Sequence, residues 1–301
     1  PPETALWDWE QERLRKLVQL SDAGDWDMPG RSGGTPLRYV AAVDISFNSA
    51  AGDPDDAVAC LVVLSFPEMH LVYERAQSVR MLEPYCPGYL AFREVPLLLP
   101  LIHGLRDSHP EYWPDILLMD GQGVMHPREF GAACHLGVLG GIPTIGVSKK
   151  LLVVDGMGRE EVEAEFKERI RAGETRMDMV GKSGKIWGVA LRATKDSEKP
   201  IYVSPGHGVS SETAEAVVRL CCKSRIPEPI RQADLVSRAI FRPEVQSGAI
   251  RDPNCVKEHS LDDTIKATYA DVVYGPRRQQ WRDRDDTCVP ERGWLTPATP
   301  V

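Results

Sequence analysis

The stretch from Ile116 to Lys150 constrains the fold of this chain more than any other segment. It begins with a short apolar run at 116–119, bounded by turn residues, which predicts a buried strand. Apolar residues at helical spacing then predict a helix over Glu129–Leu139, which a pair of glycines would end. A second strand is expected over Ile142–Val147. The order strand, loop, helix, strand is typical of an α/β fold.

An acid and two cations follow the two strands of this unit. Asp120 ends the first strand and is followed by the glycine-containing loop 121–123, whereas Lys149 and Lys150 follow the second strand. Ligands of open α/β sheets bind beyond the carboxyl ends of the strands. A carboxylate and a cation beside a glycine loop therefore indicate phosphate chemistry assisted by a divalent metal. A β-α-β connection without any chemistry explains this stretch alone equally well.

The rest of the chain predicts a mixed sheet flanked by helices. Three strands with short connections come first, which indicates an antiparallel meander, and helices then alternate with strands. The further strands are expected at 38–47, 57–65, 70–79, 185–191 and 201–204, and the further helices at 3–20, 95–105, 210–223 and 228–240.

Three parts are expected along the chain. Residues 1–36 are interpreted as an N-terminal helix followed by a linker, and residues 37–241 as the folded domain. From Arg242 the chain loses hydrophobic periodicity and is rich in Asp, Arg and Pro, so residues 242–301 are predicted to be a disordered tail.

Composition limits the classes of function. The net charge of −8 provides no global basic field for nucleic acid, so binding to a polyanion would need local basic patches and a metal. Seven scattered cysteines without a C-x-x-C pattern favour a reducing compartment and argue against structural zinc. The sequence shows neither a signal peptide nor a membrane-spanning segment, so no membrane partner is expected.

Four acids occupy positions that suggest a shared site. Asp44 interrupts a strand that is otherwise nearly all apolar, and burying it is costly unless the carboxylate binds a cation. Glu94 precedes the long Leu-rich helix, Asp120 ends a strand, and Asp234 lies on the last helix. This order is what a ribonuclease-H-like nuclease needs to hold Mg²⁺ with oxygen ligands. Taken singly, Glu94 and Asp234 are more often surface acids of helices.

Two loops carry further candidates. Tyr85 stands in a stiff segment, 84–90, and an exposed aromatic there could wedge into a stack of bases, or it could pack as part of an ordinary turn. His207 lies between glycines ahead of a helix. It could contact a phosphate or orient a water, although a lone loop histidine is more often only a surface residue.

With these residues in place, the sequence resembles the endonuclease V family, whose members are nucleases acting at inosine. Six blocks match in the family's order over roughly residues 37–240, which makes the resemblance highly specific. The blocks are YVAAVDISF, PYCPGYLAFREVP, LLMDGQGVMHPREFGAACHLG, IPTIGVSKK, VSPGHGVSSETA and RIPEPIRQADLVSR. The resemblance implies a ribonuclease-H-like fold, and the extended ends are more similar to the animal branch than to the compact bacterial one.

The resemblance also implies roles for individual residues. Asp44 and Asp120 match the carboxylates that hold the metal, and Lys149 matches the lysine beside the scissile phosphate. The remaining catalytic positions are matched by Glu94, His207 and Asp234.

A second set of matches concerns the substrate base. Tyr85 matches the wedge that fills the gap left by the displaced base. The positions that line or adjoin the base pocket are matched by Pro87, Gly88, Leu90, Gly121 and His126. Cys86 and Tyr89 depart from the aliphatic residue and the Phe that are more usual there, which leaves the wedge intact but alters the fit of the loop.

The function implied by the resemblance is Mg²⁺-dependent cleavage of single-stranded RNA, and more weakly DNA, at the second phosphodiester bond 3′ of inosine. Mn²⁺ is expected to substitute for Mg²⁺. The enzyme is expected to act as a monomer in the cytoplasm and the nucleus, including the nucleolus. Two alternatives are a nuclease for repair of deaminated adenine in DNA and a catalytically silent protein that binds inosine-containing RNA.

Overall fold

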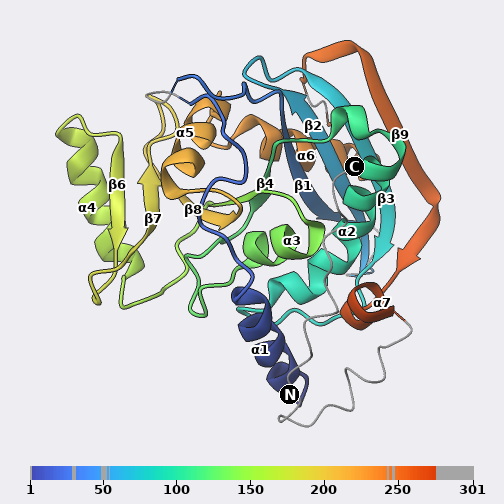
Figure 1. Ribbon diagram of the computed structural model, residues 1–301, viewed down its shortest axis with the longest axis horizontal. Coiled ribbons are helices and arrows are strands. Elements are labelled where there is room, and N and C mark those ends of the chain that lie inside the picture. The colour runs from blue at the N-terminus through green and yellow to red at the C-terminus, as the bar shows by residue number, and fades with distance from the viewer. Residues whose placement is uncertain are drawn as a thin grey trace.

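The computed structural model describes residues 2–28, 32–48, 53, 55–242, 244–245 and 248–275. Its centre is a nine-stranded mixed sheet with the strand order β6-β7-β8-β5-β4-β1-β2-β3-β9 (Figure 1). The strands are β1 (Tyr39–Phe47), β2 (Asp56–Ser65), β3 (Leu71–Arg80), β4 (Ile116–Asp120), β5 (Thr144–Ser148), β6 (Arg176–Val180), β7 (Ile186–Leu191), β8 (Ile201–His207) and β9 (Arg251–Lys266). The helices are α1 (Pro2–Arg15), α2 (Leu90–Ser108), η1 (Pro110–Tyr112), α3 (Ala132–Gly140), α4 (Arg159–Arg171), α5 (Ser211–Cys221), α6 (Glu228–Phe241) and α7 (Tyr269–Tyr274).

The middle of the sheet has the order β3-β2-β1-β4-β5. The strands β1, β2 and β3 form an antiparallel meander, and β1, β4 and β5 run parallel. The predicted α/β class and the ribonuclease-H-like mixed sheet are therefore confirmed. Parallel pairing of β1 with β4 brings the carboxyl ends of these two strands to the same edge of the sheet.

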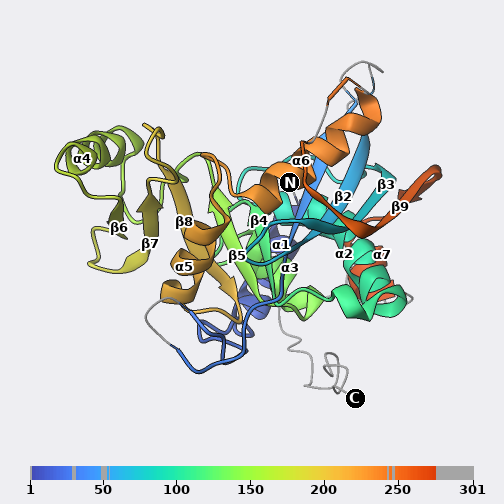
Figure 2. The same cartoon turned by 90° about the horizontal axis from the view of Figure 1, so that it is seen from above.

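Helices cover both faces of this central sheet (Figure 2). Along β1, Ala42 packs with residues of α5 and α6, whereas Ala41 and Val43 pack with residues of α2 and α3. This alternation is the two-residue period of a strand buried on both faces. It explains why the sequence of β1 is almost continuously apolar and why a charged residue within it is exceptional.

Several boundaries differ from the predictions. The first helix ends at Arg15 rather than at Leu20, because Leu17 and Leu20 are exposed and no packing extends the helix. The long helix α2 begins at Leu90 instead of Val95, so Glu94 lies inside it near its N-terminus. The helix α4 and the strand β6 were not predicted. They form one end of the sheet with a small separate core that includes Phe166 and Trp187 (Figure 1).

The prediction of a disordered tail over 242–301 is wrong for the part of it that contains β9 and α7. The strand β9 pairs in parallel with β3 at the edge of the sheet, and α7 packs against α2. Residues of β9 are mostly exposed, so the strand has no hydrophobic period that the sequence could reveal. Residues 276–301 of the predicted tail lie outside the described residues.

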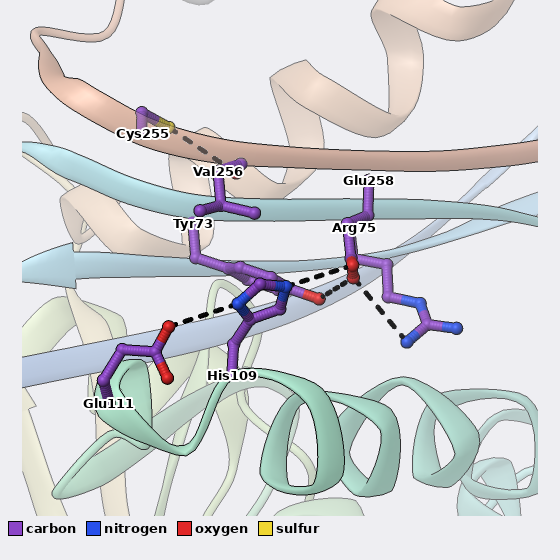
Figure 3. A network of polar contacts seen from close by, with 7 residues as sticks. All are labelled: Tyr73, Arg75, His109, Glu111, Cys255, Val256 and Glu258. Carbon is purple, nitrogen blue, oxygen red and sulfur yellow. Dashed lines mark hydrogen bonds and ion pairs between the residues drawn. The ribbon is translucent and has the colours of Figure 1, made fainter.

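Polar contacts attach β9 to the sheet (Figure 3). The Glu258 carboxylate accepts a hydrogen bond of 2.6 Å from the Tyr73 hydroxyl. It also lies 3.2 Å from Nε2 of His109 and 3.9 Å from Nη1 of Arg75. These contacts join β9 to β3 and to the end of α2.

A second set of contacts surrounds Glu74 of β3, whose side chain is buried. Its carboxylate lies 2.6 Å from Arg251, 3.3 Å from Lys257 and 3.3 Å from His259, all on β9. Burial by itself raises the pKa of Glu74, but the contacts with His259, Arg251 and Lys257 outweigh it and lower the pKa to about 2. Charge pairing thus replaces apolar burial as the force that holds this strand.

Within the N-terminal segment 1–36, predicted as a helix and linker, residues 2–28 and 32–36 are described, and several of them pack onto the rest of the protein. Trp7 and Leu14 of α1 are buried, and Trp26 of the following segment belongs to the main core. No described helix combines the length and the apolar character that crossing a bilayer demands.

Candidate active site

Two carboxylates lie side by side at the carboxyl edge of the sheet. Val43 of β1 is in register with Met119 of β4, and each is followed by an aspartate, Asp44 and Asp120. Neighbouring strands are about 4.8 Å apart, and residues in register point to the same face of a sheet. The parallel pairing therefore places both aspartates at one level on the face that α6 covers.

Hydroxyl groups orient Asp44. Its Oδ2 accepts hydrogen bonds of 2.8 Å from Ser237 of α6 and 3.2 Å from Ser46. Burial raises the pKa of Asp44, the hydrogen bond from Ser237 opposes this, and the negative charges of Asp234 and Asp120 raise the pKa further. The ionised carboxylate is therefore held in an environment that would favour a neighbouring cation.

Lys149 pairs with the second aspartate. Asp120 is in register with Val147 of β5, and Lys149 follows the end of that strand. Its Nζ lies 2.6 Å from Oδ2 of Asp120. Both side chains are partly exposed, so the pair remains open to a ligand that approaches from solvent.

Glu94 and Asp234 complete the group of acids from two different helices. Burial raises the pKa of Glu94 to about 8, together with the negative charges of Asp44 and Asp120. No described residue makes a hydrogen bond or an ion pair with the Glu94 carboxylate. Asp234, on α6, forms an ion pair of 2.7 Å with Arg238 one turn later. A polar cavity of about 330 Å³ adjoins Asp234 between β1 and α6.

The donor set of this site fits a hydrated divalent metal. Among the described residues, no three His, Cys, Asp or Glu side chains stand together as a complete metal cage. Magnesium does not require such a cage, because it usually binds one or two carboxylates and keeps several waters. The adjacent Asp44 and Asp120 supply two carboxylates, and mutual repulsion with Glu94 would be relieved by a cation.

The structure does not bring His207 to this group. His207 ends β8, which runs antiparallel to β5, and it pairs with Thr144 at the start of β5. The acids lie at the other end of β5. His207 Nδ1 instead accepts a hydrogen bond of 3.3 Å from the backbone of Gln19, and burial lowers its pKa. The expectation that His207 belongs to the catalytic group is therefore wrong.

A cavity of about 330 Å³ lies beside the acids. The predicted base-pocket residues Gly88, Leu90, Gly121 and His126 line it, and so does Tyr85, whose side chain is 67% exposed. An exposed aromatic ring at the rim of a cavity is available to stack on a base.

Pro87 is an exception among the predicted pocket residues. It is exposed in the same loop but is not among the residues that line the cavity. The sequence interpretation also missed several lining residues, which are Gln11, Ala91, Gln122, Gly131, Ala132, Leu151, Leu152 and Arg159. Lys150, which the sequence indicated only as a cation at the end of its strand, lines the cavity as well. No signal in the sequence indicates Gln11, because α1 reaches the cavity only through the tertiary fold.

The cavity and the acids share their supporting elements. Gly121 follows Asp120, Leu90 stands one helical turn before Glu94, and Lys150 follows Lys149. A nucleotide with its base in the cavity would therefore have its sugar–phosphate backbone next to the carboxylates.

Next to the site, the backbone of the loop after β4 packs closely against β5 and β8. A Cβ on Gly146 of β5 would lie 2.2 Å from the Gly123 nitrogen, and a Cβ on Gly123 would lie 2.0 Å from the Pro205 carbonyl oxygen. Only glycine permits the loop after β4 to lie this close to β5 and β8.

His126 lines the cavity as a neutral imidazole. Burial lowers its pKa to about 4, and the charge of Arg128 acts in the same direction. Its Nδ1 accepts a hydrogen bond of 3.3 Å from the Arg128 backbone, so the ring proton is assigned to Nε2.

Comparisons with known proteins point to one family. The sequence model of the family described as Endonuclease V matches residues 18–235. Human endonuclease V is 48% identical over 248 residues, which cover 80% of this chain and 85% of the human protein. The crystal structure of its catalytic domain superposes with a TM-score of 0.74 at 47% identity and covers 81% of this chain and 98% of that one.

A second solved structure is the endonuclease V of Ciona intestinalis bearing a D234N substitution. It superposes with a TM-score of 0.75 at 37% identity and covers 80% of this chain and 98% of that one. That protein was crystallised in complex with a 23mer DNA containing an inosine followed by a ribo-adenosine.

Proposed function

Since this chain belongs to the endonuclease V family and is an endonuclease, we propose that it cleaves single-stranded RNA, and more weakly DNA, on the 3′ side of inosine. The cut falls at the second phosphodiester bond 3′ of inosine and leaves a 3′-hydroxyl and a 5′-phosphate. The observation that carries this proposal is the cavity that opens between Tyr85 and Gly121, directly beside Asp120.

The cavity suits a displaced purine. Hypoxanthine presents an acceptor at O6 and a donor at N1, whereas adenine presents the reverse pattern on the same edge. A narrow site lined by backbone groups at Gly88 and Gly121 can accept hypoxanthine, reject adenine and exclude the exocyclic amine of guanine by size. Removing a base from its stack costs least in a single strand, which favours single-stranded substrates. Tyr85 then fills the gap that the base leaves.

The acids and Lys149 suit phosphodiester hydrolysis. Asp44 and Asp120 would hold Mg²⁺, or Mn²⁺ in its place, and the bound ion would supply charge neutralisation for the phosphate and acidity for the attacking water. The Lys149 ammonium, now paired with Asp120, is placed to offset negative charge that develops on the phosphate. Glu94, whose pKa is raised to about 8, can take or give a proton near neutral pH.

A cleavage assay tests this proposal. Matched single-stranded RNA and DNA oligonucleotides would carry inosine, adenosine or guanosine at one position and would be incubated with Mg²⁺ or with a chelator. We expect Mg²⁺-dependent cutting of the inosine strands only, faster in RNA, with the product ends mapped to the second bond. Equal cutting of the adenosine strand would refute the base specificity, and equal or faster cutting of DNA would refute the RNA preference in favour of a DNA repair nuclease.

The same assay separates a catalytic from a silent protein. Retained binding of the inosine strand without any cleavage at saturating Mg²⁺ would establish a reader of inosine-containing RNA. The intact group of Asp44, Glu94, Asp120 and Lys149 argues for catalysis, because a pure binding site has no need for clustered acids that repel phosphate.

A further inference from the structure

The side chain of Gln11, on α1, reaches the rim of the cavity. Gln11 is almost completely buried, and its Nε2 donates hydrogen bonds of 3.2 Å to the Gly88 carbonyl and 3.5 Å to the Phe130 carbonyl. Gly88 adopts a left-handed backbone conformation, with φ of +83°, in the loop that carries Tyr85. Gln11 therefore joins the loop on one side of the cavity to the segment before α3 on the other.

Arg128 contacts both Gln11 and Gly88. Its Nε donates to the Gln11 side-chain oxygen, and its Nη2 donates to the Gly88 carbonyl at 2.7 Å. The guanidinium also lies over the Tyr89 ring, with 4.2 Å between Cζ and the ring centroid. Both polar ends of Gln11 are thus occupied by protein groups, so Gln11 positions the loop and does not itself read the base.

A buried hydrogen-bonded chain holds α1 in place. The Tyr269 hydroxyl of α7 donates to Glu10 Oε1 at 3.0 Å and lies 2.7 Å from His135 Nε2 of α3. Burial and the charge of Arg13 lower the pKa of His135 to about 3, so His135 is neutral. Because the hydroxyl proton goes to Glu10, the Nε2 proton of His135 points to the tyrosine oxygen.

These two helices flank the part of the chain that the family model matches. Gln11 precedes residue 18 and lines the cavity, whereas Tyr269 follows residue 235 and donates a hydrogen bond to Glu10, the neighbour of Gln11. Glu10 and Gln11 are adjacent, so the contact that fixes Glu10 also fixes the residue that reaches Gly88.

We propose that Gln11 is a positioning residue of the base pocket, and that together with Arg128 it anchors the Gly88 carbonyl, fixes the backbone of the loop at Gly88 and so sets the selectivity of the cavity for its base. This inference rests on the proposed function, because it assumes that the cavity takes the base of inosine. It adds the N-terminal helix, held by α7, to the parts of the molecule that determine specificity.

Binding measurements test the inference without cleavage. Fluorescein-labelled single-stranded RNA with one inosine, or with adenosine at the same position, would be titrated in a chelating buffer. Gln11→Met keeps the length and volume of the side chain but removes the donor and the acceptor. We expect Gln11→Met to raise the Kd for the inosine strand about tenfold, because hydrogen bonds in a charged network are lost. The Kd for the adenosine strand should change less than about twofold.

A matched control separates positioning from general destabilisation. Gln77 is another buried glutamine whose Nε2 donates to a backbone carbonyl, that of Ser260 at 2.9 Å, but it lies between β3 and β9. Gln77→Met should leave the ratio of the two Kd values unchanged. Arg128→Lys keeps the positive charge but removes the planar guanidinium that donates through two nitrogens. It should lose selectivity as Gln11→Met does. This second variant keeps the test available if Gln11→Met does not fold.

The outcomes are distinguishable. An unchanged ratio of the inosine and adenosine Kd values in folded Gln11→Met or Arg128→Lys protein would overturn the inference. A wild-type protein that binds and cleaves both strands equally would instead overturn the proposed function.

Discussion

The Nζ of Lys149 lies 2.6 Å from Oδ2 of Asp120, across the carboxyl ends of two parallel strands. A cation and an acid from neighbouring strands thus meet at the edge of the sheet where we propose that the substrate phosphate binds. Because the pair is only partly buried, it contributes little to folding stability, and its main effect is the charge that it presents to a ligand.

Replacing Lys149 by Met should lower kcat about 100-fold, because a preorganised positive charge beside the phosphate is lost. The thermal unfolding temperature should change little, since the ion pair is exposed to solvent. Single-turnover cleavage of an inosine-containing RNA measures the effect. Lys167→Met serves as a control on the exposed face of α4, and an equal loss of activity in both variants would contradict the role of Lys149.

Replacing Asp44 by Asn should abolish detectable cleavage, because the proposed site would lose one of the two carboxylates that would hold the metal. The same change should stabilise the metal-free protein, since burial and the nearby acids raise the pKa of Asp44 and so disfavour its ionised form. The Tm of the metal-free protein should therefore rise. Calorimetry in a chelating buffer, with cleavage measured in parallel, checks both effects. A lower Tm would show that the carboxylate is not repelled by its neighbours.

Replacing Tyr85 by Ala should weaken displacement of the base without destabilising the fold, because the ring is largely exposed. Stacking of one base on an aromatic ring is worth about 1–3 kcal/mol, so kcat/KM should fall about tenfold or more for a structured RNA. Tyr85→Phe should retain most of the activity. Equal activity of the Ala and Phe variants on structured RNA would exclude a wedge.

Acid should release β9 from the sheet. The pKa of Glu74 is lowered from 4.5 to about 2, so its contribution to stability is complete above pH 4.5 and is lost as the pH falls towards 2. Hydrogen exchange at the backbone amides of 256–260 should therefore accelerate over this range. Glu74→Gln should reduce this pH dependence to the part that Glu258 contributes, because the pKa of Glu258 is also lowered, and should cost about 1.5–3 kcal/mol of stability at neutral pH. Protection that is independent of pH in the wild-type protein would contradict the prediction.

Two aspartates and one histidine show which site residues could be identified from the sequence. Asp44 and Asp120 were recognisable because each interrupts or ends an apolar strand, and a burial cost without a partner indicates a ligand. His207 was assigned to the catalytic group by the resemblance to the family, and a loop histidine between glycines carries no information about the direction of its strand that could have corrected this assignment. Antiparallel pairing of β8 with β5 decided its position, and this pairing depends on contacts distant in the sequence.

The amino-acid sequence by itself determined the succession of the central strands along the chain, their apolar character, and the acids within or at the end of these strands. Each of these follows from local periodicity and the cost of burying charge. Only the tertiary structure decided that Gln11 reaches the cavity, that Tyr269 holds α1, and that a polar strand with three basic residues around Glu74 completes the sheet. These contacts join residues up to 259 positions apart, and their stability comes from paired charges and hydrogen bonds, which leave no period in a sequence.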